Sequence, residues 1–127
     1  LDKKHIYAFL RGELGNRIIK SSHVMREYRF TVRIPSSGIG SGKSIGDEKI
    51  IVQGAIDCVF KENDGYVIVD YKTDRIKNLS ILVQKYSKQL NIYKYAFETC
   101  EEVKVKELLI YSLHVGDFIR CPMQNFI

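Results

Sequence analysis

Two aspartates occupy matching positions on either side of a predicted hairpin turn. Asp57 and Asp70 each lie in an apolar run rich in β-branched residues, and the two runs flank the sequence Asn63-Asp64-Gly65. Such a pattern is typical of a β-hairpin. Folding the chain between the first two turn residues places Asp57 directly opposite Asp70, because both are equally far from that point.

Two facing carboxylates within apolar strands need a partner. Opposed Cβ atoms on paired strands are roughly 4.5–5.5 Å apart, and like charges at that separation repel. A hard cation such as Mg²⁺ would convert this repulsion into coordination. Lys72 follows Asp70 by two residues, so strand alternation places its ammonium on the same face. The spacing therefore predicts a metal-dependent site made of Asp57, Asp70 and Lys72.

This pattern resembles the PD-(D/E)xK nuclease signature, with Asp57 as its first acid and Asp70-Tyr71-Lys72 as its second element. The phrases Gln-Gly-Ala-Ile-Asp and Val-Asp-Tyr-Lys-Thr-Asp are similar to the nuclease domain of bacterial AddA/RecB-type helicase–nucleases. Farther along, Gln89 and Tyr93 reproduce the Q-x-x-x-Y element of the RecB-like branch. Three motifs in the correct order are more specific than one. The resemblance covers residues 26–113.

The resemblance implies Mg²⁺- or Mn²⁺-dependent hydrolysis of DNA phosphodiester bonds. Asp57 and Asp70 would hold the metal ion, aided by the Tyr71 carbonyl. Lys72 would orient the attacking water and stabilise charge on the phosphate. We expect Lys72 to act in its charged form, because two carboxylates favour an ammonium over a neutral amine.

The resemblance also implies partners and further site residues. Gln89 and Tyr93 would help to hold the active site and the DNA strand. We expect an exonuclease of double-strand-break repair and recombination, joined to helicase domains of a larger parent chain and to a second helicase–nuclease subunit. The sequence begins with Leu1 rather than Met, which suggests a C-terminal fragment of a larger chain. If the fragment starts after a helix that carries a further metal-linked residue in the family, its own activity would be weak.

One part of the family pattern lacks a clear match. The related nucleases carry a further metal-linked residue, often His, on a helix ahead of a Glu-x-x-Phe strand. Here His5 and Glu13 are the candidates for that helix residue, and neither matches convincingly. Glu27 with Phe30 matches the strand element.

The role of Glu27 stays open between two interpretations. It is either a supporting residue of the site or a solvent-facing carboxylate paired with Arg29 or Arg33, since surface pairs imply little about function. Gly54, just before the site, is equally open. It marks either a close approach of the substrate or the tight packing of a helix over the sheet.

Composition fits one globular domain over residues 1–127. The chain is 45% hydrophobic and carries a net charge of +5, which suits a polyanionic partner such as DNA. Its three cysteines show no paired spacing, so neither a disulfide framework nor a zinc site is indicated. Cys58 and Cys100 are expected in or near the core. With no long apolar run and no signal peptide, we expect a cytoplasmic protein without membrane contact.

The predicted elements form an α/β sandwich. We expect a mixed central sheet flanked by helices, which agrees with the restriction-endonuclease-like fold that the resemblance implies. A helix over residues 2–14 should end at Gly15-Asn16, and the strand over residues 48–60 should be buried on both faces at its start. The remaining predicted elements are strands at 24–34, 66–72, 102–113 and 118–121, a helix at 79–100 that begins with a cap from Asn78 or Ser80, and a flexible Gly/Ser-rich loop at 36–47.

Two other functions compete with a nuclease. The first is a non-catalytic DNA-binding or scaffolding module that keeps the fold, although such a module has no reason to retain two opposed carboxylates. The second is nucleotide binding through Gly42-Lys43-Ser44. The phosphate-loop pattern requires a glycine where Ser37 stands and a helix after Ser44, and this sequence has neither.

Overall fold

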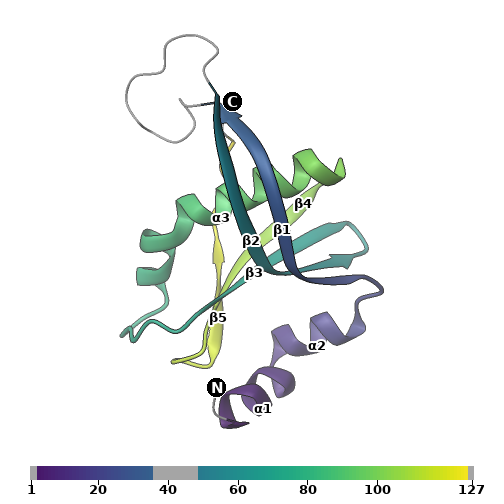
Figure 1. Ribbon diagram of the computed structural model, residues 1–127. Helices are drawn as coiled ribbons and strands as arrows, with labels where there is room; N and C mark the ends of the chain where they lie inside the picture. Colours follow the sequence, from purple (N-terminus) through teal and green to yellow (C-terminus); the bar gives the residue numbers. More distant parts are fainter. Residues whose placement is uncertain (1–2, 36–48, 126–127) are drawn as a thin grey trace.

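A five-stranded sheet lies between one long helix and two short ones in the computed structural model, which describes residues 3–35 and 49–125 (Figure 1). Along the chain the elements are α1 (Lys3–Arg11), α2 (Glu13–Lys20), β1 (Val24–Pro35), β2 (Lys49–Glu62), β3 (Gly65–Lys72), α3 (Ser80–Glu101), β4 (Val105–Ser112) and β5 (Asp117–Cys121).

The sheet is mixed, as predicted. Its strand order follows the chain from β1 to β5, and every neighbouring pair is antiparallel except β3 and β4. These two are parallel because the long helix α3 carries the chain back across the sheet between them. One apolar cluster forms beneath α3, and a second forms on the other face beneath α2. No helix within the described ranges is long and apolar enough to cross a membrane.

The β2–β3 hairpin adopts the predicted register. Glu62 pairs with Gly65 across the turn, and the ladder continues to the pair of Cys58 with Val69. One further step in this register places Asp57 opposite Asp70. The hairpin alone therefore brings the two carboxylates to facing positions.

The first half of β2 is more exposed than predicted. Ile50 and Ile51 are 40% and 61% exposed, so the expectation of burial on both faces was wrong. Only residues 58–62 of β2 pair with β3, whereas the earlier half pairs with β1 alone. The β1–β2 pair projects beyond the rest of the sheet as a two-stranded arm (Figure 1). An apolar run predicts burial only where another layer covers it.

The N-terminal helical segment is broken at Gly12, not at Gly15. Gly12 has extended backbone at the start of α2 (φ −80°, ψ 172°), while Gly15 lies inside that helix. A Cβ on Gly15 would lie 2.2 Å from the Phe9 carbonyl oxygen. This glycine lets the two short helices pack closely, so reading it as a helix end was wrong.

Two smaller predictions also failed, and one stays untested. Cys100 is exposed, although Cys58 is buried as expected. The N-cap of α3 is Leu79, which makes no side-chain cap bond, and the hydroxyl of Ser80 instead donates to the side chain of Asn78. The predicted loop at 36–47 lies outside the described residues, and so does its Gly-Lys-Ser sequence.

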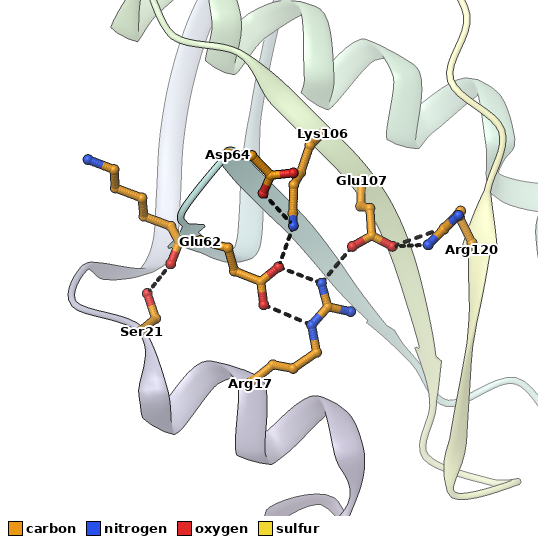
Figure 2. Close-up of polar contacts among 8 residues, drawn as sticks. Arg17, Ser21, Glu62, Asp64, Lys106, Glu107 and Arg120 are labelled. Atoms are coloured by element: carbon orange, nitrogen blue, oxygen red, sulfur yellow. Dashed lines mark hydrogen bonds and ion pairs between the residues drawn. The ribbon is translucent and has the colours of Figure 1, made fainter.

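A network of ion pairs fastens α2 to the sheet (Figure 2). The guanidinium of Arg17 donates two hydrogen bonds to Glu62, at 2.8 and 2.9 Å, and one to Glu107, at 2.6 Å. The Lys106 ammonium lies 2.7 Å from Oε1 of Glu62, and Nη2 of Arg120 lies 2.6 Å from Oε2 of Glu107. The Arg17 hydrogen bond is the main reason that the pKa of Glu62 falls to about 2. The network joins α2 to β2, β4 and β5.

Replacing Arg17 with alanine should destabilise the fold. Removing one member of a partly buried, hydrogen-bonded charge network costs about 2 kcal/mol. Because Glu62 has a lowered pKa, its contribution is present above its ordinary pKa and is lost as the pH falls toward about 2. In Arg17→Ala this acid-dependent part should shrink. Urea unfolding at pH 7 and at pH 3 measures both effects, with Arg11→Ala as the surface control. Equal losses in the two variants would contradict the assigned role.

Candidate active site

The paired strands β1 and β2 are kinked at the position of Asp57. Their ladder has one missing pair, Glu27 with Asp57, and Glu27 has a left-handed backbone with φ of 50°. Ile56 packs in the cluster beneath α3, whereas Cys58, two residues later, packs in the cluster on the other face. Strict alternation would place both on one face. The strand therefore exchanges faces at Asp57, through a local irregularity of the kind often found beside active sites.

The carboxylate of Asp57 reaches across to β3 from this kink. Its Oδ2 accepts a 2.9 Å hydrogen bond from the backbone amide of Tyr71. The side chain of Tyr71 points to the opposite face, where the centroid of its ring lies 5.5 Å from the centroid of the Phe9 ring. Tyr71 can therefore serve the site only through its main chain, and metal binding by its carbonyl stays a prediction.

Asp70 is a buried carboxylate with incomplete compensation. It is 3% exposed, and its Oδ2 has no hydrogen bond of good geometry. The ammonium of Lys72 lies 2.7 Å from that oxygen as an ion-pair partner. Burial, reinforced by Asp57, raises the pKa of Asp70 to about 6 despite the opposing effect of Lys72. Ionised Asp70 therefore destabilises the fold.

Lys72 connects the carboxylates to the long helix. Its ammonium donates a 3.0 Å hydrogen bond to Oε1 of Gln89, whose Nε2 donates in turn to the Tyr93 hydroxyl at 3.0 Å. The Tyr93 ring meets that of Phe30 on β1 edge to face at 5.8 Å. Burial is the largest cause that raises the pKa of Tyr93 to about 12, so its hydroxyl stays protonated at neutral pH. The structure thus brings together the side chains of Asp57, Asp70, Lys72, Gln89 and Tyr93.

Gly54 makes room for this aromatic pair. It is the cross-strand partner of Phe30, and a Cβ there would lie 2.9 Å from Cζ of the Phe30 ring. The sequence left open whether the glycine serves substrate approach or the packing of a helix. The structure shows that it accommodates the ring of the neighbouring strand, which in turn contacts Tyr93.

Sequence reasoning missed Tyr86 and Asp74. The Lys72 ammonium lies 4.0 Å from the centroid of the Tyr86 ring, and the Tyr86 hydroxyl donates a 2.8 Å hydrogen bond to Asp74. One signal could have identified Tyr86. It precedes Gln89 by three residues on α3, so helical geometry places it on the same face as the Q-x-x-x-Y pair.

The donor set fits a hard divalent cation. The facing oxygens of Asp57 and Asp70 are the ligand type that Mg²⁺ and Mn²⁺ prefer, and Oδ2 of Asp70, which accepts no hydrogen bond, would give such an ion a buried acceptor. Within residues 3–35 and 49–125, however, no group of three His, Cys, Asp or Glu side chains could hold a metal. The described structure therefore supplies two facing carboxylates, and their role as metal ligands stays a prediction.

The other acidic and histidine candidates do not complete that set. His5 lies on α1, where it lines an apolar hollow of about 310 Å³ with Phe9, Tyr71 and others, and Glu13 lies on α2. Glu27 is exposed at the kink and forms no described ion pair with Arg29 or Arg33. Its position opposite Asp57 leaves a supporting role as a prediction.

Fold and site together define a class of protein. A mixed sheet flanked by helices, with two acids and a lysine at a hairpin, is the arrangement of a restriction-endonuclease-like nuclease fold. A family model described as the PD-(D/E)XK nuclease superfamily matches residues 4–119. The chain therefore belongs to that superfamily.

Curated relatives extend this result, and they are named as one subunit of an ATP-dependent helicase/nuclease. The chain is 44% identical over 119 residues to the relative from Clostridium acetobutylicum, and 39% identical over 123 residues to the relative from Heliobacterium modesticaldum. Each match covers 91% of this chain but only 10% or 9% of the relative. The chain thus spans about a tenth of the length of these relatives.

A solved structure supports the fold alone. The crystal structure of SSO0001 superimposes with a TM-score of 0.56 at 14% sequence identity, and the match covers 98% of this chain and 52% of that one. At this level of identity the likeness carries no information about activity.

Asp70→Asn should remove the destabilising effect of a buried negative charge. Because the pKa of Asp70 is raised, ionising it destabilises the fold, so wild-type stability should fall relative to the variant as the pH rises from about 4 to 6. We compare the free energy of unfolding of the variant with that of the wild type, in EDTA. Between pH 3.5 and pH 8 this difference should shift in favour of the variant by up to about 3 kcal/mol. Thermal unfolding against pH tests this, with the exposed Asp117→Asn as control. A pH-independent difference would contradict it.

Proposed function

We propose that this chain is the metal-dependent DNA nuclease domain of an ATP-dependent helicase–nuclease. The observation that carries the proposal is the pair of facing carboxylates, half-buried Asp57 and buried Asp70, with the Lys72 ammonium 2.7 Å from the second. Membership of the nuclease superfamily and the names of the relatives support it.

Each site residue has a role that its contacts support. When bound by Asp57 and Asp70, Mg²⁺ or Mn²⁺ would supply Lewis-acid polarisation of a DNA phosphate and lower the pKa of the attacking water. Lys72 orients that water and stabilises charge that develops on the phosphate. Because the Asp70 carboxylate lies so close to the Lys72 ammonium, we assign Lys72 electrostatic stabilisation and not the role of a neutral base.

The Q-x-x-x-Y pair is arranged to help hold the DNA strand. Gln89 uses its carbonyl oxygen on Lys72 and its amide nitrogen on Tyr93. Since the Tyr93 hydroxyl accepts from Gln89, its own proton remains available for a phosphate oxygen. Gln89 therefore aligns the lysine and the tyrosine toward one substrate group.

The proposed biological setting is that of the relatives. They are named as a helicase/nuclease component and are roughly ten times longer than the matched region, so we propose that residues 1–127 form the nuclease domain of a larger chain with helicase domains. A second helicase–nuclease subunit, exonuclease action in double-strand-break repair and recombination, and a cytoplasmic location belong to the same proposal.

A DNA-binding module without cleavage is the second candidate. It is favoured by one observation: within the described parts of the chain, the carboxylate pair has no third metal-binding side chain beside it. Such a module would bind DNA equally well with the site residues replaced. Cleavage assays on matched variants separate the two functions.

Cleavage should depend on both a divalent ion and the acidic pair. End-labelled linear single- and double-stranded DNA should be degraded with Mg²⁺ or Mn²⁺ and remain intact in EDTA. Asp57→Asn, Asp70→Asn and Lys72→Ala should each lower the rate by at least about a hundredfold, because each removes a charge that acts in the transition state. Asp117→Asn, an exposed isosteric control, should leave it unchanged. DNA binding without cleavage by the wild type would favour the second candidate.

A further inference from the structure

We infer that Tyr86 and Asp74 position Lys72 for the nuclease reaction: the Tyr86 ring holds the ammonium, and Asp74 fixes the ring. The inference rests on the proposed function, because it assigns a role to residues around the proposed catalytic lysine. Neither residue belongs to the acid–acid–lysine or Q-x-x-x-Y patterns.

The contact of Lys72 with Tyr86 is a strong cation–π geometry. The Nζ lies 4.0 Å from the ring centroid, well within the roughly 6 Å over which such attraction acts. The Lys72 side chain is 16% exposed, and cation–π attraction is larger where the cation is partly desolvated. Lys85 lies 5.4 Å from the same ring, but it is 59% exposed and pairs with Asp74. Lys72 is therefore the cation that the ring holds closely.

The ammonium of Lys72 is contacted from two sides, by Asp70 on the strand and by Gln89 and Tyr86 on the helix. A lysine side chain loses on the order of 2 kcal/mol of rotamer entropy when it is held in one geometry. Asp70 alone would draw the ammonium toward the proposed metal site. Gln89 and Tyr86, three residues apart on one face of α3, contact the ammonium from the helix side. Strand and helix together define its position.

Asp74 fixes the ring in turn. Its Oδ2 accepts 2.8 Å and 2.7 Å hydrogen bonds from the Tyr86 hydroxyl and the Lys85 ammonium. Asp74 follows Lys72 by two residues in the segment that leaves β3. The segment that carries the lysine thus also anchors the ring that holds it, and this fixes the start of α3 relative to the end of β3.

The first test is spectroscopic and needs no activity. In the chain with ¹³C-labelled lysine, the ε-methylene protons of Lys72, assigned through Lys72→Met, should resonate upfield of those of the other lysines, because the adjoining ammonium lies 4.0 Å from the centroid of the Tyr86 ring. Tyr86→Phe should keep this shift and Tyr86→Leu should abolish it, with Tyr7→Leu as an exposed-tyrosine control. A wild-type Lys72 resonance at the ordinary lysine position would overturn the inference.

The second test is kinetic. Tyr86→Leu should lower kcat for DNA cleavage about ten- to a hundredfold with KM changed less than about threefold, because misplacing a catalytic group costs rate more than substrate binding. Tyr86→Phe, which keeps the ring, should recover most of the loss. Asp74→Ala combined with Tyr86→Phe should be no slower than the slower single variant, because Asp74 acts through the hydroxyl. Unchanged kcat in a folded Tyr86→Leu protein would overturn the inference.

The two tests separate this inference from the proposed function. If the Lys72 resonance depends on the Tyr86 ring but the wild-type chain does not cleave DNA, the contact between Lys72 and Tyr86 is supported and the proposed nuclease function is contradicted. If the chain cleaves DNA with a metal ion but the Lys72 resonance is unshifted, the nuclease function is supported and the positioning role of Tyr86 is contradicted. Should Tyr86→Leu fail to fold, as judged by its thermal unfolding, Tyr86→Phe, Asp74→Ala and their double variant still decide the outcome, because additive effects in the double variant contradict an action through one hydroxyl.

Discussion

The repulsion between two facing carboxylates is the constraint on which the rest of the site depends. Asp57 and Asp70 meet at the end of a hairpin ladder, and the second is almost completely buried. Ordinary folding would avoid such an arrangement, because burying a charge is costly unless the charge is paired. The only described cation close to Asp70 is Lys72, and its ion pair leaves the pKa of the carboxyl raised. The site is therefore short of positive charge.

The backbone around Asp57 shows how the fold accepts this arrangement. Glu27, opposite Asp57, adopts a left-handed conformation that costs a residue other than glycine on the order of 1–3 kcal/mol. The kink turns Asp57 toward the face of Asp70 while the flanking strand residues stay packed in two cores. Strain and buried charge coincide at one point of the sheet. Such a coincidence is typical of a functional site, because a purely structural hairpin would relax both.

Much of this arrangement could be predicted from the sequence, because it depends on short-range rules. A two-residue turn and a period of two determine the facing of Asp57 and Asp70 and the side on which Lys72 lies. A four-residue spacing on a long amphipathic helix places Gln89 beside Tyr93. These predictions hold because strand register and helix periodicity leave little freedom.

The errors arise where a tertiary contact overrides a local pattern. Ile50 and Ile51 look like a buried strand but lie on a projecting arm, because no third strand extends that far. Gly15 looks like a helix end but provides space for Phe9. The kink at Glu27 and the contact of Tyr86 with Lys72 have no local signature, since each depends on two elements that meet only in the folded chain.

The two faces of the sheet differ in how far their charged side chains are neutralised. On the side of α2, Arg17, Lys106 and Arg120 pair with Glu62, Asp64 and Glu107, so three cations there match three carboxylates. On the side of α3, Lys72 pairs with Asp70, and the neighbouring carboxylate of Asp57 helps to raise the pKa of Asp70. A fully neutralised cluster contributes stability but attracts no further ion, whereas an under-neutralised one gains most when a cation arrives. The matched network can therefore offset the instability of the site, and that instability is what the proposed metal ion would relieve.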